Sequence, residues 1–225
     1  MDFKKIKGFA FDLDGVLTDT AKFHAQAWQE LCEKLGIQWT ETMASGTKGI
    51  SRMDSLNLIL GEANRQNDFT MAEKQQMAQN KNEYYKALIR KLTPNDVLPG
   101  IADFLAELKQ AGYRIALASA SHNAPVILER LELTSFFDTI VNPAHLKQGK
   151  PAPDIYLVAA EQMNLAPEEV IGVEDALSGV EAIHSAHEVA IGVNNDELKT
   201  VADLYFATTA DLSLAHIEQA SYFAK

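Results

Sequence analysis

Two aspartates, Asp12 and Asp14, stand at the end of a short apolar run and are followed directly by Gly15. In a strand, residues two apart point to the same face, so both carboxylates are expected at one edge of the strand. That edge is the C-terminal one, where open α/β sheets bind ligands. Glycine permits a sharp turn there and a close approach of a ligand to the backbone. The spacing therefore predicts a ligand site at the end of the first strand.

Two carboxylates this close repel each other unless a cation lies between them or one of them holds a proton. Either arrangement is useful, because one carboxylate can act as a metal-bound nucleophile and the other as a proton donor and acceptor. For Asp-x-Asp alone, the alternative is an acidic corner between a strand and a loop. The full string Asp-x-Asp-Gly-x-Leu-x-Asp, from Asp12 to Asp19, is much longer than such a corner requires. It favours the catalytic interpretation.

Three further polar clusters follow expected strands or precede expected helices. They are residues 119–123, Lys150 between Gly149 and Pro151, and the adjacent acids Glu174 and Asp175. Hydroxyl groups and free backbone N–H groups at a helix N-terminus can bind an anion, and carboxylate oxygens suit Mg²⁺. Taken singly, each cluster has an ordinary alternative: a helix N-cap for 119–123, a solvated side chain for the lysine, and an exposed acidic loop for the pair.

The composition is that of an acidic protein with enough apolar residues for a substantial core. The 225 residues are 47% hydrophobic and carry a formal net charge of −11, with a pI near 5.0. A charge of this sign argues against a nucleic acid or an anionic membrane as partner, and no segment approaches the length of a transmembrane helix. Cys32 has no second cysteine to pair with, so we expect it in the core of a protein from a reducing compartment. We expect a cytoplasmic location without a leader segment, and a monomer.

Two kinds of pattern divide the chain. Residues 21–90 indicate helices almost throughout, with an apolar stripe at helical spacing in 23–35 and a helix expected over 71–90. The rest alternates strands with helices, and the expected strands are 8–11, 114–118, 139–141, 170–173, 189–193 and 204–207. This alternation predicts βαβ units, a mostly parallel sheet and an α/β fold. We expect an α/β core of residues 1–15 and 93–225, with a helical cap of residues 16–92 inserted into it.

Taken together, the four clusters resemble in order the four loop motifs of the haloacid dehalogenase superfamily. The resemblance implies a Rossmann-like parallel-sheet core with an inserted α-helical cap. In phosphotransferases of this superfamily the first aspartate forms an aspartyl-phosphate and the second is the general acid/base, which implies these roles for Asp12 and Asp14. It also implies that Ser119 and Lys150 bind the transferring phosphoryl group. The implied Mg²⁺ ligands are Asp12, the backbone carbonyl of Asp14, Glu174 and Asp175.

The inserted block, through residues 18–20, His24, Trp28, 47–55 and 81–82, resembles the cap of sugar-phosphate mutases in this superfamily. Such enzymes interconvert β-D-glucose 1-phosphate and glucose 6-phosphate through β-glucose 1,6-bisphosphate, which also primes them. They hold two phosphates at once, and Arg52 fits the distal one because a guanidinium binds phosphate oxygens in a bidentate manner. The other substrate-binding residues that the resemblance implies are Thr20, His24, Trp28, Lys48, Gly49, Lys81, Ala120, Ser121 and Asn123.

Several alternatives stay open at this point. Taken singly, Arg52 could be a solvated charge, His24 an ordinary helix histidine and Trp28 a core residue. The nearest alternative function is a sugar-phosphate phosphatase with the same core, in which water accepts the phosphoryl group. An alternative of another class is a non-catalytic regulator that binds sugar phosphates, against which the complete set of catalytic residues argues. The resemblance also implies a cis peptide bond between Lys150 and Pro151.

Overall fold

The computed structural model describes residues 2–47 and 50–223, and the chain divides into two compact units. The first unit comprises Met1–Asp19 and Leu92–Lys225, and the second comprises Thr20–Lys91. Residues 16–19, which the sequence placed in the cap, lie in the first unit. The reason is local pairing, because Thr18 Oγ1 donates to the carbonyl of Asp96 at 2.7 Å and the amide of Leu98 donates to the carbonyl of Leu17 at 2.9 Å.

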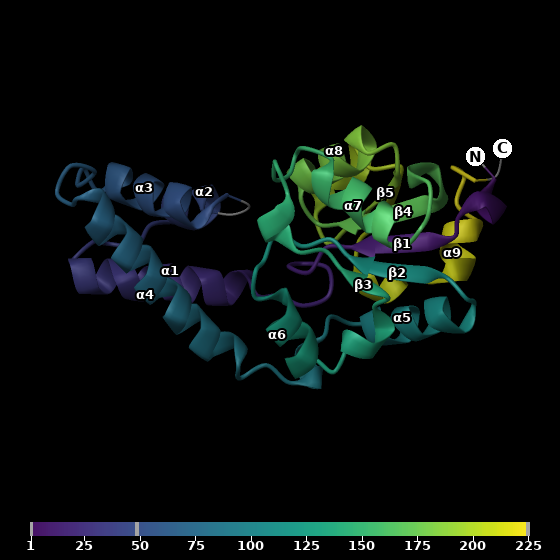
Figure 1. Ribbon diagram of the computed structural model, residues 1–225, viewed down its shortest axis with the longest axis horizontal. Coiled ribbons are helices and arrows are strands. Elements are labelled where there is room, and N and C mark those ends of the chain that lie inside the picture. The colour runs from purple at the N-terminus through teal and green to yellow at the C-terminus, as the bar shows by residue number, and fades with distance from the viewer. Residues whose placement is uncertain (1, 48–49, 224–225) are drawn as a thin grey trace. The chain divides into compact units, whose positions relative to one another are not determined.

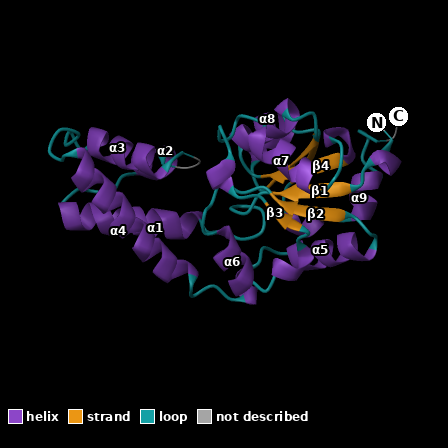
Figure 2. Cartoon of the chain, in the orientation of Figure 1, coloured by secondary structure: helices purple, strands orange, loops and turns teal. Residues whose placement is uncertain are grey.

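The first unit is built on a six-stranded sheet in the order β3-β2-β1-β4-β5-β6, and every neighbouring pair is parallel. Figures 1 and 2 show this sheet with helices on both sides. The strands are β1 (Gly8–Phe11), β2 (Arg114–Leu117), β3 (Thr139–Ile140), β4 (Val170–Glu174), β5 (Val189–Val193) and β6 (Leu204–Phe206). The expected α/β fold with a parallel sheet is confirmed. Because the strands are parallel, their carboxyl ends share one edge of the sheet.

Side-chain alternation along β1 assigns its residues to the two faces of the sheet. Phe9 and Phe11 both make edge contacts with the ring of Phe104, with ring centres 5.8 and 6.0 Å apart. Phe104 belongs to α5 (Ile101–Gln110). Ala10 points the other way and joins the core cluster formed with α7 (Asp154–Gln162) and α8 (Leu177–Ser185). The strand is buried on both faces, as a continuous apolar run predicts.

The remaining helices of the first unit lie between or after the strands. They are α6 (Ala124–Arg130) and α9 (Leu214–Glu218), and α9 packs on α5. Near the C-terminus, the ring of Phe223 lies 5.1 Å from that of Phe3. The described segments nearest the two ends of the chain therefore lie side by side, as Figure 1 also shows.

The second unit contains only helices among its described residues: α1 (Ala21–Leu35), α2 (Glu41–Gly46), α3 (Arg52–Glu62) and α4 (Met71–Ile89). Gly36 ends α1 in a left-handed conformation with φ 66°. Thr70 and Glu73 start α4 with a capping box. Apolar faces of these helices form one core that includes Cys32, which is buried and free. In the part of the chain that the structure describes, no helix has the length and apolarity needed to cross a bilayer.

Candidate active site

The loop after β1 places Asp12 at the carboxyl edge of the sheet. The amide of Asp12 donates to the carbonyl of Val173 at 3.0 Å, which ties this position to the neighbouring strand β4. Asp12 is 8% exposed. Gly15 turns the loop with φ 76°, a conformation that L side chains rarely adopt. The backbone then closes on itself, because the amide of Gly15 donates to the carbonyl of Thr18 at 2.9 Å.

Lys150 joins the two acidic loops of the site. Its ammonium lies 2.6 Å from Asp12 Oδ1 and 2.6 Å from Glu174 Oε1. The lysine side chain is 12% exposed, so these are strong charge-assisted contacts in a setting of low dielectric. The Lys150–Pro151 bond is cis, as the resemblance implied.

Glu174, the last residue of β4, is held by four hydrogen bonds. Its Oε1 accepts from Lys150 and, at 3.2 Å, from the phenol of Tyr156. Its Oε2 accepts from the amides of Asp175 and Ala176 at 2.9 and 3.1 Å. A β-carbon at Gly179 would lie 1.9 Å from the Glu174 carboxyl carbon, so glycine in α8 makes room for this carboxylate.

Three carboxylates form a candidate cation site. Ligand atoms of Asp12, Glu174 and Asp175 all lie within 4.8 Å of one another, and hard carboxylate oxygens are the ligands that Mg²⁺ prefers. Asp14 adds a buried Oδ1 atom without a hydrogen-bond partner among the described residues. The donor set therefore fits a hard divalent cation.

Burial and mutual repulsion raise the pKa values of Asp12, Asp14 and Asp175. Burial first, then the charge of Asp12, raises the pKa of Asp14 to about 8. Burial, followed by the charges of Glu174 and Asp12, raises the pKa of Asp175 to about 7. Burial also raises the pKa of Asp12 to about 6, although Lys150 opposes the shift. For Lys150, burial lowers the pKa, but the Asp12 and Glu174 carboxylates outweigh it, and the pKa ends above its usual value. At pH 7, Asp12 is mainly ionised and Asp14 mainly protonated, which are the forms that a nucleophile and a general acid need.

The second loop, after β2, presents small polar groups. Ser119 is buried, with 3% of its surface exposed. Its Oγ accepts from the amide of Ser121 at 3.2 Å, and Ser121 Oγ accepts from the amide of Asn123 at 3.3 Å. These two bonds fold the chain tightly ahead of α6. Ala120 lies exposed in the same turn.

Within the second unit, three of the expected residues form one cluster. Lys81 Nζ lies 2.9 Å from His24 Nδ1 and 4.5 Å from the centre of the Trp28 ring. Because an ammonium only donates, the Nδ1 atom accepts and the ring proton is assigned to Nε2. Burial, followed by the positive charges of Lys81 and Arg52, lowers the pKa of His24 to about 3, so its ring is neutral at pH 7.

Four further expected residues belong to the second unit. Arg52 begins α3 and is partly buried. Thr20 is fully buried, and its hydroxyl has no hydrogen-bond partner within residues 2–47 and 50–223. Lys48 and Gly49 lie outside the described residues.

Tyr156 also belongs to the first unit's site, although it was not among the residues predicted from the sequence. The side chain is fully buried in the first turns of α7, and its hydroxyl donates to Glu174. The available signal was a phenol in an apolar helix stripe, since buried tyrosine hydroxyls usually have a partner. The sequence alone does not identify Glu174 as that partner, because Glu174 lies 18 residues further along the chain.

Comparisons with known proteins agree with this architecture. A model of the haloacid dehalogenase-like hydrolase family matches residues 6–187. The chain is 44% identical over 209 residues to the β-phosphoglucomutase of Bacillus subtilis, covering 93% of this chain and 92% of that protein. It is 32% identical to a phosphorylated carbohydrates phosphatase of Thermotoga maritima, covering 78% of this chain and 79% of that protein.

One solved structure is similar to this chain over nearly the whole length of both proteins. The crystal structure of β-phosphoglucomutase from Clostridium difficile matches with a TM-score of 0.89 and 41% sequence identity, covering 97% of each chain. The family match spans more than half of the chain and includes all four loops of the first unit's site. This chain belongs to the haloacid dehalogenase-like hydrolase family.

Proposed function

We propose that this protein is a β-phosphoglucomutase, which interconverts β-D-glucose 1-phosphate and glucose 6-phosphate through β-glucose 1,6-bisphosphate. The observation that carries the proposal is the arrangement of Lys150 with Asp12 and Glu174 at the carboxyl edge of the sheet. Such a group of one cation and several carboxylates suits the transfer of a phosphoryl group. Similarity to the B. subtilis mutase over 93% of the chain supports the choice of substrate.

Asp12 is the proposed nucleophile. One of its carboxylate oxygens attacks phosphorus, the bond from phosphorus to the sugar oxygen breaks, and an aspartyl-phosphate forms. Asp14 gives its proton to the departing sugar oxygen, since its pKa near 8 keeps it protonated at pH 7. In the second half of the cycle, Asp14 takes the proton of the incoming sugar hydroxyl while the phosphoryl group leaves Asp12. The acid and base roles of Asp14 thus alternate, and no net proton is consumed.

Positive charge must balance the phosphoryl group in this acidic protein. Lys150 supplies one charge directly, from its position beside Asp12. Mg²⁺, held by Asp12, Glu174, Asp175 and the backbone carbonyl of Asp14, would neutralise further charge on the phosphoryl oxygens. Ser119 and the backbone of the turn with Ala120 would donate hydrogen bonds to the same group.

The second unit is proposed to bind the part of the substrate that does not react. Arg52 would hold the distal phosphate, and Lys48 and Gly49 are further proposed substrate-binding residues. The further substrate-binding residues that we propose are, in the second unit, His24, Trp28, Lys81 and Thr20 and, in the first unit, Ser121 and Asn123. Closure of the cap would keep water away from the aspartyl-phosphate, so that a sugar hydroxyl accepts the phosphoryl group instead.

A phosphatase is the second candidate, and the similarity to the T. maritima phosphorylated carbohydrates phosphatase favours it. The two activities share the first half-reaction and differ in the acceptor, which is water in a phosphatase. For either activity we propose a cytoplasmic monomer acting on small sugar phosphates.

One experiment separates the two candidates. The protein is given β- or α-D-glucose 1-phosphate with Mg²⁺ and a trace of the bisphosphate, and glucose 6-phosphate and free phosphate are measured together. The mutase proposal predicts glucose 6-phosphate from the β anomer, far more slowly from the α anomer, with little free phosphate. Free phosphate formed as fast as glucose 6-phosphate would favour the phosphatase.

A further inference from the structure

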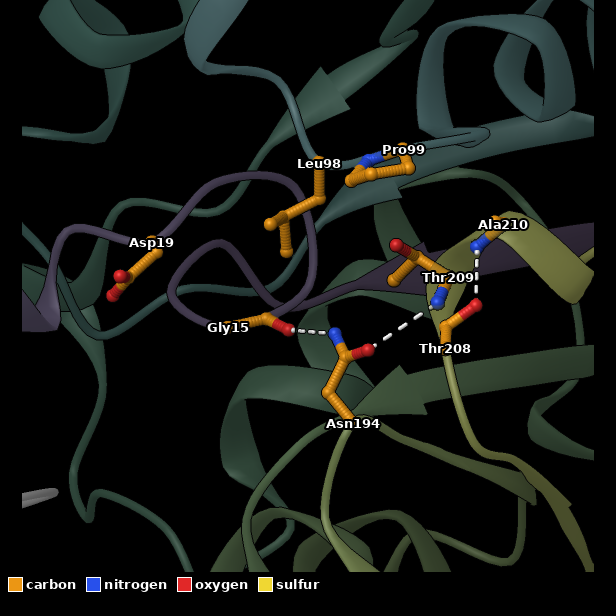
Figure 3. Close-up of a pocket in the computed structure, with 8 residues that line it drawn as sticks. All are labelled: Gly15, Asp19, Leu98, Pro99, Asn194, Thr208, Thr209 and Ala210. Carbon is orange, nitrogen blue, oxygen red and sulfur yellow. Dashed lines mark hydrogen bonds between the residues drawn. The ribbon is translucent and has the colours of Figure 1, made fainter.

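Two consecutive asparagines at the carboxyl end of β5 bind both acidic loops of the site. Asn194 Nδ2 donates to the carbonyl of Gly15 at 2.8 Å, and Asn195 Nδ2 donates to the carbonyl of Asp175 at 3.0 Å. Figure 3 shows the first of these bonds, with the amide of Asn194 directed at the loop after β1. Neither asparagine belongs to the catalytic set proposed above.

Each asparagine amide is also held at its oxygen. Asn194 Oδ1 accepts from the amide of Thr209 at 3.3 Å, and Asn195 Oδ1 accepts from the amide of Glu197 at 3.1 Å. Because the oxygen of each side chain accepts from a backbone N–H, the nitrogen must face the loop carbonyl. Both side chains are therefore fixed donors toward the catalytic loops.

The backbone of Asn194 supports this role. It adopts a left-handed conformation with φ 57°, which asparagine tolerates better than most residues. Its amide donates to the carbonyl of Phe206 at 3.3 Å, so the end of β6 holds it in place. The donor toward Gly15 is thus anchored to the sheet.

The two loops that the asparagines hold lie against each other. A β-carbon at Gly15 would be 1.9 Å from Asp175 Oδ2. A small shift of either loop would therefore change how Asp14, next to Gly15, lies relative to Asp175. Gly15 also borders a pocket of about 490 Å³ that Asn194, Leu98 and Pro99 line (Figure 3). At the wall of this pocket, the hydrogen bond from Asn194 ties the Gly15 carbonyl to the carboxyl end of β5.

We propose that Asn194 and Asn195 are positioning residues that set the spacing between the loop of Asp14 and the loop of Asp175. The inference rests on the proposed function, since these loops hold the acid/base and a metal ligand. The asparagines do not touch the phosphoryl group. They act by fixing two backbone carbonyls, and through them the carboxylates that must converge on one Mg²⁺ and one phosphate.

The test compares variants that remove the side-chain amide, and with it the donor toward each loop. Asn194→Gly keeps the left-handed backbone without strain, and Asn195→Ala suits the extended backbone at that position, where φ is −138°. Two controls match them. Asn164→Gly replaces an asparagine with the same φ of 57° in the turn after α7. Asn142→Ala removes an equivalent capping bond, from the Ala144 amide to Asn142 Oδ1.

Two quantities are measured for each full-length variant. Mg²⁺ affinity is obtained by titration calorimetry, and kcat with β-D-glucose 1-phosphate is obtained at saturating Mg²⁺. Misplacement of catalytic groups by about 1 Å costs up to ~10²-fold in rate, so we expect each donor variant to lose about tenfold in kcat. We also expect several-fold weaker Mg²⁺ binding. Asn194→Asp, which keeps the acceptor for Thr209 but has no donor for Gly15, should lose kcat as Asn194→Gly does.

Failure of the positioning role and failure of the proposed function would give different results. Donor variants that match their controls in both kcat and Mg²⁺ affinity would overturn the inference, and so would a loss of kcat explained by equal loss of folded protein. If the parent protein binds Mg²⁺ but shows no mutase turnover, the proposed function fails, while the calorimetric comparison still tests the positioning role.

Discussion

Removal of the Lys150 charge should destabilise the metal-free protein by several kcal/mol. The variant Lys150→Met keeps most of the side-chain volume but leaves Asp12 and Glu174 without the ammonium that lies 2.6 Å from each. Loss of one partner from a buried ion pair typically costs ~3–5 kcal/mol, because the remaining charge stays uncompensated. The lysine side chain is only 12% exposed, so its ion pairs with Asp12 and Glu174 are close to fully buried ones.

The pKa of Asp12 and the hydrogen bond to Glu174 give a second estimate of this loss of stability. The pKa of Asp12 is about 6 with Lys150 present. If Asp12 becomes neutral in the variant at pH 7, its pKa must rise by at least one unit, which costs ~1.4 kcal/mol. Loss of the charge-assisted hydrogen bond to Glu174 adds ~1.5–3 kcal/mol. The sum is about 3–4 kcal/mol, equivalent to a fall of roughly 6–16 °C in melting temperature for a chain of this size.

The destabilisation caused by Lys150→Met should also depend on pH. The folded-state pKa of Asp12 lies above the unfolded value of 3.8, so its ionisation weakens the fold as pH rises from about 4 to 6. Lys150 counters this cost only where Asp12 is ionised. The difference between Lys150→Met and the parent should therefore be largest above pH 7 and shrink below pH 6.

The assay is thermal unfolding in excess chelator at pH 5.5 and pH 8, with Lys147→Met as the matched control. Lys147 is an exposed lysine three residues earlier in the chain, so its replacement should leave the melting temperature nearly unchanged. Equal melting temperatures for Lys150→Met and Lys147→Met at pH 8 would refute the electrostatic reasoning. With Mg²⁺ present, Lys150→Met should also lose about 10²–10³-fold in kcat.

Three further predictions concern the metal, a glycine and a histidine. Mg²⁺ should bind more tightly as pH rises from 6 to 8, because the cation displaces protons from Asp12 and Asp175. The pKa values of these two acids are about 6 and 7. A pH-independent Kd for Mg²⁺ in calorimetry would contradict this prediction. Gly179→Ala should weaken Mg²⁺ binding at least tenfold, because the new β-carbon displaces the Glu174 carboxylate. This loss is expected although alanine has the higher helix propensity. An Mg²⁺ affinity equal to that of the parent protein would show that the carboxylate adapts. In ¹⁵N NMR spectra, His24 should remain neutral with its proton on Nε2 down to about pH 4, whereas titration near pH 6.5 would disprove that environment.

Much of the fold could be predicted from local patterns. All six strands were expected within one residue of their observed bounds, because each is a short apolar run between turn signals. The short helices α2 and α9 were not predicted, since six and five residues are too few to show a helical period. The boundary at residue 16 was drawn at the end of the glycine loop, whereas pairing of Thr18 with Asp96 extends the core to Asp19.

The candidate site was predictable in its positions but not in its contacts. Polar residues directly after apolar strands located Asp12, Ser119 and Glu174, because parallel strands end at one edge. That Lys150 also binds Glu174, and that Tyr156 supports it, depends on packing between distant segments. Asn194 follows β5 and carried the same signal as the residues that were chosen. Its partner is a backbone carbonyl, which no side-chain pattern identifies.

The central claim is that the phosphoryl group passes through Asp12. The most direct measurement is rapid acid quenching during turnover of β-D-glucose 1-phosphate with Mg²⁺ and bisphosphate, followed by peptide mapping by mass spectrometry. We predict a phosphoryl group on the peptide that contains Asp12, located on that residue, and none in Asp12→Asn, which should also lack mutase turnover. Full turnover by Asp12→Asn, or a phosphoryl group found on another residue of the parent protein, would contradict the mechanism.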